Sequence, residues 1–530
     1  MVSASKPCRE PKRPARIRKL LTHPVIKSII YGRVVLSFIF AAAQLAVFFI
    51  FIARVQKYVE FFLGLNSILS FIFIIYLVNK SGKNEYKIAW LVPSLIFPLF
   101  GIGLYLWFHA DVRRKHIQRS LKKLRTVIEP HLIAAQPPET AVVSEFDTTG
   151  ITHYLARNAG FVPYAASAVQ YYPSGEASLS DIMQAINSAE HFIFIEFFII
   201  NPGVMWDALL TALIKKRASG VEIRVIYDSF GSIALSPRRY ERYLESLGIK
   251  TLAFVPVVPF IVPHQFSRDH RKIIVVDNKI GFTGGINISD EYINKKPRFG
   301  YWKDTMVQLS GPAVNSLTGL FLSNWNLFEK SIEDVSPYFL PVAPVPDADG
   351  IVIPFGDDPY DDLENGENVY CSMIDNARHS VHITTPYIVV DNQMLHSIIY
   401  AVQRGIDVTL IIPSQADHYI TFCVGRVVIK TLINNGVHIY SFAPGFIHAK
   451  MVIADGQYAV VGSINFDYRS FNNQFESAVL MYNKKIITDI ERDFAAIKAQ
   501  SEEITQAAYK KIPAVQRMIG WCFRLFAPLI

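Results

Sequence analysis

The sequence predicts two related α/β lobes, with mixed, largely parallel sheets covered by helices, behind an N-terminal all-α membrane segment. Three observations predict this fold class. Long apolar runs lie within the first 108 residues, strand and helix patterns alternate after about residue 150, and the second part of that region repeats the first. Strand–helix–strand order gives parallel strands that helices cover. A chain of 530 residues is also long enough for more than one core.

The composition is apolar and basic. Hydrophobic residues make up 51% of the chain, the mean hydropathy is +0.24 and the formal net charge is +8. A basic balance suits an anionic partner, either lipid head groups or nucleic acid, and does not choose between them. The four cysteines have no C-x-x-C spacing, which argues against a zinc site or a disulfide framework: Cys8, Cys371, Cys423 and Cys522.

Residues 1–33 form a basic tail, and residues 34–108 are predicted to be a membrane segment with two to three spans. Its apolar runs cover residues 34–53, 61–78 and 88–108, each close to the roughly 20 residues that cross a bilayer. The third run is either a kinked span or a re-entrant segment, because it contains the breakers Pro93, Pro98, Gly101 and Gly103.

Basic residues flank the membrane segment on both sides, in the tail and again in a basic linker over residues 109–149. Lys and Arg beside membrane spans favour the cytoplasmic side. Three complete spans would place the two basic flanks on opposite sides of the membrane, so one of them would lie on the non-cytoplasmic side. We expect the large domain on the cytoplasmic face. The basic stretch after the third run either contacts anionic lipid or forms a solvated helix face.

The two lobes are predicted over residues 150–335 and 368–512. Short apolar, aromatic and β-branched runs are typical of buried strands, and each run in the first lobe has a counterpart in the second. Residues 191–198 match 381–387, and residues 220–228 match 405–413.

Two further segments complete the chain. Residues 336–367 are rich in proline and acidic residues, which is typical of a linker. Residues 513–530 combine aromatic and aliphatic side chains with Arg517 and Arg524. This amphipathic segment is either an interfacial helix or a helix that caps the core.

A third matched pair of segments carries the chemistry. Each copy has the form H-x-K-x4-D, followed by a glycine seven residues after the Asp and an asparagine ten residues after it. A single copy would be a strand with a polar face, whereas two copies inside a longer repeat indicate one shared site. The motif residues are His270, Lys272 and Asp277 in the first copy, and His448, Lys450 and Asp455 in the second.

The spacing of the motif explains why it suits a phosphodiester. Residues i and i+2 of a strand face the same side, so each His and Lys point into one space. Ammonium groups and the amides of Asn287 and Asn465 can bind the non-bridging oxygens. One imidazole can attack phosphorus, while the other protonates the leaving alcohol and then deprotonates the acceptor. Because the lysines neutralise the phosphate, we expect no metal and no cofactor.

Small residues follow each motif and allow the backbone to approach closely. They are Gly284 and Gly285 in the first copy, and Gly462 and Ser463 in the second.

The double motif resembles the HKD signature of the phospholipase D superfamily. The resemblance implies two fused lobes related by pseudo-twofold symmetry, with one active site at their junction. It also implies that His270 is the nucleophile and that His448 is the general acid and base.

Four carboxylates accompany these histidines. The resemblance includes Asp277 and Asp455 in the catalytic set, but five residues after the Lys is an odd offset on a strand and favours support of the fold. Family members usually carry an acidic residue after each asparagine that orients an imidazole. Here the candidates are Asp304 and Glu476. Each of them either orients an imidazole or is a structural or surface carboxylate.

A longer likeness narrows the family. Residues 284–292, 301–305, 311–313 and 462–470 resemble bacterial cardiolipin synthases, as does 91–106 with its Pro and Gly breakers. The likeness covers roughly residue 59 to the end of the chain. It implies that phosphatidylglycerol is donor and acceptor, that cardiolipin and glycerol are the products, and that the protein is a multi-pass protein of the bacterial cytoplasmic membrane.

Four alternatives stand beside this interpretation. Water as the acceptor would make the protein a phospholipase D that releases phosphatidic acid, and another alcohol would make it a different phosphatidyltransferase. A nuclease is disfavoured because DNA requires no membrane anchor, so we expect no nucleic-acid partner. A non-enzymatic scaffold is disfavoured because both motifs are intact. The oligomeric state stays open.

Overall fold

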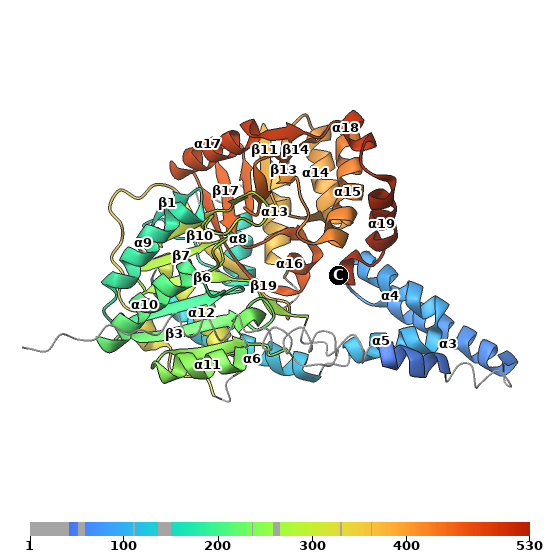
Figure 1. The fold of residues 1–530 in the computed structure, drawn as a ribbon, viewed down its shortest axis with the longest axis horizontal. Helices are drawn as coiled ribbons and strands as arrows, with labels where there is room; N and C mark the ends of the chain where they lie inside the picture. The colour runs from blue at the N-terminus through green and yellow to red at the C-terminus, as the bar shows by residue number, and fades with distance from the viewer. Residues whose placement is uncertain are drawn as a thin grey trace, which may run out of the picture.

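Two α/β lobes form the body of the molecule, and a group of N-terminal helices extends from one side of it (Figure 1). The computed structural model describes residues 42–50, 59–109, 112–135, 150–235, 237–257, 266–328, 331–361 and 363–529.

The first lobe contains a seven-stranded sheet in the order β1-β9-β7-β6-β2-β3-β4. The strands are β1 (Ala168–Tyr172), β2 (Phe192–Phe197), β3 (Glu222–Asp228), β4 (Lys250–Phe254), β6 (Lys272–Val276), β7 (Ile280–Gly284) and β9 (Met306–Ser310). Its helices are α9 (Gly175–Ser188), α10 (Val204–Ala218), α11 (Pro237–Ser246) and α12 (Val314–Asn326). Helices α9 to α11 share a core with one face of the sheet, and α12 packs on the other face.

The second lobe repeats this topology in the order β10-β19-β17-β16-β11-β13-β14-β20. The strands are β10 (Ile351–Asp357), β11 (Ser380–Thr384), β13 (Asp407–Pro413), β14 (His438–Phe442), β16 (Met451–Ala454), β17 (Tyr458–Gly462), β19 (Gln474–Tyr482) and β20 (Ser501–Glu503). Its main helices are α13 (Asn365–Asn376), α14 (Asn392–Gln403), α15 (Tyr419–Asn434) and α17 (Ile486–Ala499).

The mixed character of the sheets is confirmed, but the expected predominance of parallel pairs is wrong. Apart from the two-residue strand β5 (Arg268–Asp269), which pairs in parallel with β19, parallel pairing among the described strands of these two sheets joins β2, β3 and β4 in one and β11, β13 and β14 in the other. Helical crossovers connect these strands, as parallel neighbours require. Each motif strand instead returns through a short turn as an antiparallel hairpin, β6–β7 or β16–β17.

Part of the expected linker 336–367 belongs to the second lobe. Residues Ile351–Asp357 form β10, which pairs along its whole length with β19. The prolines before this strand and the acidic residues after it are typical of a linker, and the short run Ile351 to Phe355 between them was therefore not predicted as a strand.

The two lobes share one core. Val275 and Leu309 of the first lobe and Met451 and Val479 of the second lobe belong to the same buried cluster, which also includes residues of α12. Apolar burial therefore holds the two motif strands on opposite sides of a common interior.

The N-terminal helices are α3 (Val59–Asn79), α4 (Asn84–Ile96), α5 (Pro98–His109) and α6 (Val112–Ala134). The third apolar run is thus two short helices that break at Phe97, because a residue before proline avoids the helical region. Within the described ranges, no helix combines the length and the apolar character that crossing a bilayer requires. Most of the first predicted run, 34–53, lies outside those ranges.

Candidate active site

The motif histidines follow two short strands that cross from one lobe to the other. β5 (Arg268–Asp269) pairs in parallel with the start of β19, and the backbone N–H of His270 donates to the carbonyl of Phe475 at 2.9 Å. β15 (Gly445–Ile447) pairs in parallel with β8 (Tyr301–Lys303), and the N–H of His448 donates to the carbonyl of Lys303 at 2.7 Å. Each histidine is thereby fixed beside a residue that precedes a carboxylate of the other lobe.

Each imidazole meets the carboxylate that this pairing brings to it. Nδ1 of His270 lies 2.9 and 3.0 Å from the two carboxylate oxygens of Glu476, and Nδ1 of His448 lies 2.7 Å from Oδ2 of Asp304. An imidazole that donates its Nδ1 proton to a carboxylate presents an unprotonated Nε2, which can act as nucleophile or base. The sequence indicated both carboxylates but not which histidine each would contact.

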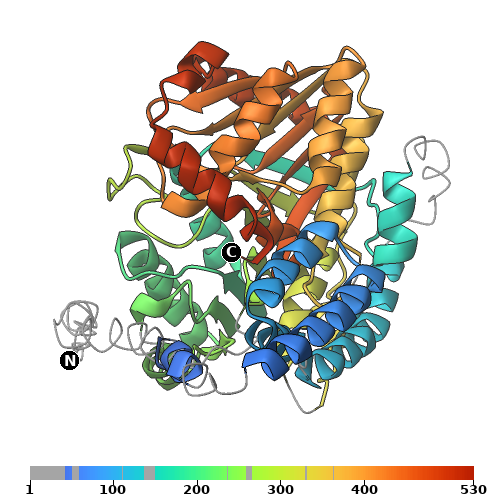
Figure 2. The same cartoon turned by 90° about the vertical axis from the view of Figure 1, so that its right-hand side faces the viewer.

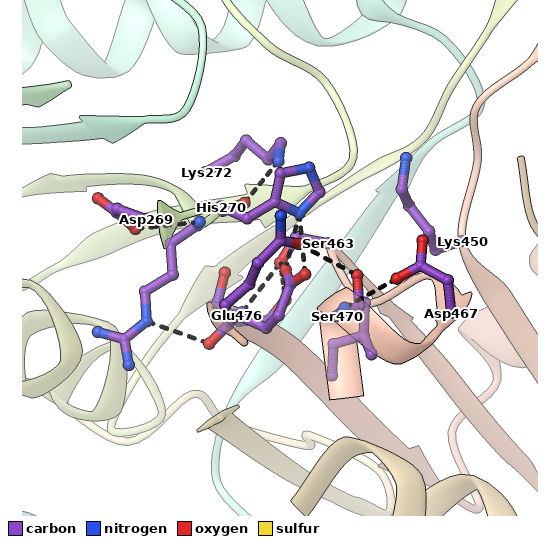
Figure 3. A network of polar contacts seen from close by, with 12 residues as sticks. Asp269, His270, Lys272, Lys450, Ser463, Asp467, Ser470 and Glu476 are labelled. Carbon is purple, nitrogen blue, oxygen red and sulfur yellow. Dashed lines mark hydrogen bonds and ion pairs between the residues drawn. The ribbon is translucent and has the colours of Figure 1, made fainter. Parts of the chain in front are cut away.

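The motif lysines lie in the same buried space. Lys272 donates to the backbone carbonyl of His270, and Lys450 donates to that of His448, with its Nζ 2.7 Å from the His448 Nδ1. Figure 3 shows Lys272, His270 and Lys450 gathered between the two lobes. Four nitrogen bases in one enclosed space form a site that favours an anion.

Burial determines the protonation of these groups. Burial and the neighbouring lysines hold the pKa of His270 well below its ordinary value and lower the pKa of His448 to about 4. Burial also lowers the pKa of Lys272 to about 7 and that of Lys450 to about 8. Both imidazoles are therefore neutral near pH 7, and a bound phosphodiester would restore the lysines to their charged forms.

The small residues that follow the motifs make room for the carboxylates. A Cβ on Gly285 would lie 2.0 Å from Oδ1 of Asp304, so only glycine allows this carboxylate to approach His448. At the equivalent position, the Ser463 hydroxyl donates to Glu476. Burial raises the pKa of Glu476 to about 8, while Lys272 and this hydroxyl oppose the shift.

The two asparagines differ in their contacts. The Asn287 side-chain oxygen accepts from the N–H of Ile199 at 3.1 Å, and its amide donates to the Tyr292 hydroxyl at 2.7 Å. The side-chain oxygen of Asn465 is buried and has no protein donor. Of the two asparagines, Asn465 is therefore the one whose side-chain oxygen can accept a hydrogen bond from a ligand.

The motif aspartates lie at the far end of their strands and hold the backbone. Asp277 accepts from the N–H groups of residues 190–192 at 2.7 to 2.8 Å, and Asp455 accepts from those of residues 378–380 at 2.7 to 3.0 Å. Both adopt positive φ in the hairpin turn. These contacts agree with the expectation, from their offset, that the aspartates support the fold.

Three aromatic side chains complete the walls of the site. The Phe198 ring lies 5.1 Å from that of His270, and the rings of Tyr292 and Trp302 lie 5.5 and 5.6 Å from that of His448. Sequence reasoning did not select them, because aromatic residues near a motif are as common in cores as in sites. In the described part of the chain, no group of three His, Cys, Asp or Glu side chains is placed to hold a metal.

The fold and the paired motifs define an enzyme of the phospholipase D class. A family model described as "Cardiolipin synthase, PLD-like domain" matches residues 182–298 and 370–498, one segment in each lobe. The chain belongs to the cardiolipin synthase family, whose members are phosphatidyltransferases.

The proteins similar to this chain include two bacterial relatives and one solved structure. A protein of Streptococcus mutans without an assigned activity is 39% identical over 86% of this chain and 99% of its own length. The cardiolipin synthase of Geobacillus kaustophilus is 33% identical over 88% of this chain and 94% of its own. The phosphatidylserine synthase of Haemophilus influenzae shares the fold, with a TM-score of 0.55 at 14% identity over 72% of this chain and 98% of its own.

Proposed function

We propose that this chain transfers a phosphatidyl group from one phosphatidylglycerol molecule to another, which gives cardiolipin and glycerol. The observation that carries the proposal is the crossed arrangement of the site. Each lobe supplies one imidazole and one lysine, and each imidazole is oriented by a carboxylate of the other lobe. Two equivalent bases around one anion-binding space match a reaction in which two alcohols exchange places on one phosphorus.

In the first step, Nε2 of His270 attacks phosphorus and the bond from phosphorus to the glycerol oxygen breaks. His448 takes up a proton when the anionic phosphodiester binds beside it and gives this proton to the leaving oxygen, so glycerol leaves as a neutral alcohol. Lys272 and Lys450 stabilise the charge that grows on the non-bridging oxygens, and Glu476 stabilises the positive imidazole ring of the phosphohistidine.

In the second step, the terminal hydroxyl of another phosphatidylglycerol loses its proton to His448 and attacks phosphorus. The phosphorus–nitrogen bond breaks, and its electron pair returns to His270. Asp304 keeps His448 oriented through both proton transfers. Water in place of this alcohol would give phosphatidic acid. The rings of Tyr292 and Trp302 beside His448 give the acceptor side of the site an apolar wall, which favours a lipid alcohol over water.

We also propose that helices α3 to α5 and the C-terminal helix α19 (Ala514–Arg524) attach the enzyme to the bacterial cytoplasmic membrane. They lie on the same side of the molecule (Figure 2), and their large apolar side chains are exposed: Ile68, Phe71, Ile72, Ile96, Leu106 and Trp107 on α3 to α5, and Val515, Met518 and Trp521 on α19. Exposed apolar groups on one face are typical of a membrane-contacting surface. A multi-pass attachment with the lobes on the cytoplasmic face is part of the same proposal.

The experiment that tests the reaction uses the purified full chain with labelled phosphatidylglycerol in mixed micelles and separates the lipid products. Cardiolipin together with released glycerol is the expected result. Phosphatidic acid alone would mean that water is the acceptor and that the protein is a phospholipase. No turnover would contradict phosphatidylglycerol as donor, and phosphatidylethanolamine would be the next lipid tried.

A further inference from the structure

The internal repeat allows the two half-sites to be compared position by position. The motif aligns residue 270 with 448, so Asp269 corresponds to Ile447 and Arg271 to Ala449. The aspartate turns align residues 190–192 with 378–380, so Glu196 of β2 corresponds to Thr384 of β11. The sheet registers agree, because Glu196 faces Ile273 and Thr384 faces the equivalent Met451.

The side chains packed behind the two histidines differ in their chemistry. Beneath His270 lie three buried ionisable side chains, Glu196, Asp269 and Arg271, whose exposed fractions are 0%, 0% and 3%. The corresponding positions beneath His448 hold a threonine, an isoleucine and an alanine. Buried charged groups are costly unless they are paired, so their presence in only one half-site indicates a role specific to that half.

The two carboxyl groups contact each other. Glu196 also accepts from the Asn324 amide at 2.7 Å, and Asp269 accepts from the backbone N–H of Arg271 at 3.2 Å. The second oxygen of each carboxyl has no donor in the protein. One proton held between the two groups satisfies both oxygens and leaves a single negative charge opposite the Arg271 guanidinium.

Arg271 connects the two lobes directly behind the nucleophile. Its Nε donates to the carbonyl of Glu476 at 3.1 Å, its Nη1 to that of Leu320 at 3.1 Å, and its Nη2 to that of Asp357 at 3.3 Å. These carbonyls belong to β19, α12 and β10. The Arg271 side chain therefore connects the segment that holds His270 to Glu476 of β19, and also to α12 and β10.

We propose that Glu196, Asp269 and Arg271 form a positioning brace that distinguishes the nucleophilic half-site from the acid–base half-site. The proposal rests on the proposed function. A nucleophile must hold one nitrogen in line with phosphorus, and small displacements of reacting groups are costly. His448 protonates one alcohol and then deprotonates another, so its imidazole must reach two different oxygen atoms and is expected to be less tightly fixed. Figure 3 shows the side chain of Asp269 directed away from the His270 ring, as expected for a residue that acts through the backbone.

The test measures phosphohistidine formation in a single turnover of the full-length enzyme with labelled phosphatidylglycerol. Arg271→Met is expected to slow this step by about 100-fold, the cost typical of a misplacement of about 1 Å, with KM changed less than about threefold. The matched controls in the other half-site are Thr384→Val and Ala449→Ser, for which the rate is expected to stay within about twofold of wild type. A wild-type rate in Arg271→Met, or an equal loss in the controls, overturns the brace.

A second pair of variants separates positioning from loss of folding. In Glu196→Gln, the amide can donate to Asp269 in place of the shared proton, so most of the wild-type rate is expected to return. Glu196→Ala leaves Asp269 without this partner and is expected to resemble Arg271→Met. Equal rates in the two variants contradict the brace. A wild-type enzyme that makes cardiolipin without phosphohistidine would overturn the proposed mechanism as well, whereas unaffected variants of a phosphohistidine-forming enzyme overturn the brace alone.

Discussion

Glu476 is the carboxylate whose removal should affect the nucleophile most directly. In the proposed mechanism, attack on phosphorus places a positive charge on the His270 ring, and Glu476, which contacts its Nδ1, becomes the carboxylate that balances this charge. Glu476→Gln keeps the shape but cannot become charged, so we expect phosphohistidine formation to fall about 10⁴-fold, as in comparable carboxylate–histidine pairs. The matched control is Glu491→Gln, which alters a His–Glu pair with His382 away from the site and should leave the rate unchanged. A similar loss in both variants would mean that the effect is not specific to the site.

Substrate binding should weaken as the pH rises from 6 to 9. Burial lowers the pKa of Lys272 to about 7 and that of Lys450 to about 8, so both ammonium groups lose their protons over this range. Burial also raises the pKa of Glu476 to about 8, so this side chain gains negative charge over the same interval. The phosphodiester remains an anion throughout, so all three changes oppose its binding.

Kinetics in mixed micelles at several pH values will check this expectation. KM for phosphatidylglycerol should rise at least about tenfold between pH 7 and pH 9, which is the effect of Lys450 alone when binding requires its protonated form and its pKa is about 8. A KM that is constant or falls with pH would show that the lysines keep their charge in the free enzyme.

The sequence predicted which side chains gather in the candidate site but not their pairing. Alternation along a strand places His270 beside Lys272 from local geometry alone. The contacts between His270 and Glu476 and between His448 and Asp304 join residues 206 and 144 positions apart. Such contacts depend on how two lobes pack, which no local pattern contains. Arg271 was missed for the same reason, because its three carbonyl partners lie far away in the sequence.

At the level of elements, the short cross-lobe strands are the most sensitive part of the site. A Cβ on Gly445 would lie 2.2 Å from the Tyr301 carbonyl oxygen, so Gly445→Ala must separate β15 from β8 and move His448 away from Asp304. We expect transfer activity to fall about 100-fold. Gly103→Ala is the control, since nothing lies within 4 Å of its Cβ position. Full activity in Gly445→Ala would show that this strand pair does not position the histidine.

The connection between α3 and α4 is a second sensitive element. Lys83 lies 3.0 Å from Asp391 and 3.3 Å from Glu364, and it also pairs with Glu367. Burial lowers its pKa, but the three carboxylates outweigh burial and raise it above the ordinary value. Lys83 thus attaches the N-terminal helices to the second lobe.

Lys83→Met would leave three acidic groups without their cation, and removal of one partner from a buried ion pair costs about 3–5 kcal/mol. We expect a lower Tm and faster hydrogen exchange in α3 and α4. Lys87→Met, which removes one exposed bond to the Val78 carbonyl, should change stability by less than about 0.5 kcal/mol. Equal stability of the two variants would argue against Lys83 as the main attachment.

At the scale of the whole molecule, α19 brings the C-terminus against the N-terminal helices. One face of α19 packs closely on α15, where a Cβ on Gly520 would lie 2.0 Å from the Cys423 carbonyl oxygen. The residues that follow α19 contact α4. The opposite face of α19 exposes Met518 and Trp521 by 60% and 74%. The two alternatives for this segment are therefore compatible, because the helix covers the lobe with one face and presents an apolar face outward.

If that outward face contacts the bilayer, its loss should matter only when the substrate is in a bilayer. Burial of a large apolar side chain contributes about 1.5–3 kcal/mol, so a Met518→Ser, Trp521→Ser double variant should turn over phosphatidylglycerol in vesicles at least about tenfold more slowly. Its activity on dispersed short-chain phosphatidylglycerol should equal that of wild type, because the site itself is unchanged. Val204→Ser alters an equally exposed residue on α10, on the opposite side of the body from α19 (Figure 1), and should affect neither assay. A loss on both substrates would mean that the double substitution disturbs the fold of the second lobe. No loss on vesicles would contradict contact between α19 and the bilayer and leave the N-terminal helices as the membrane attachment.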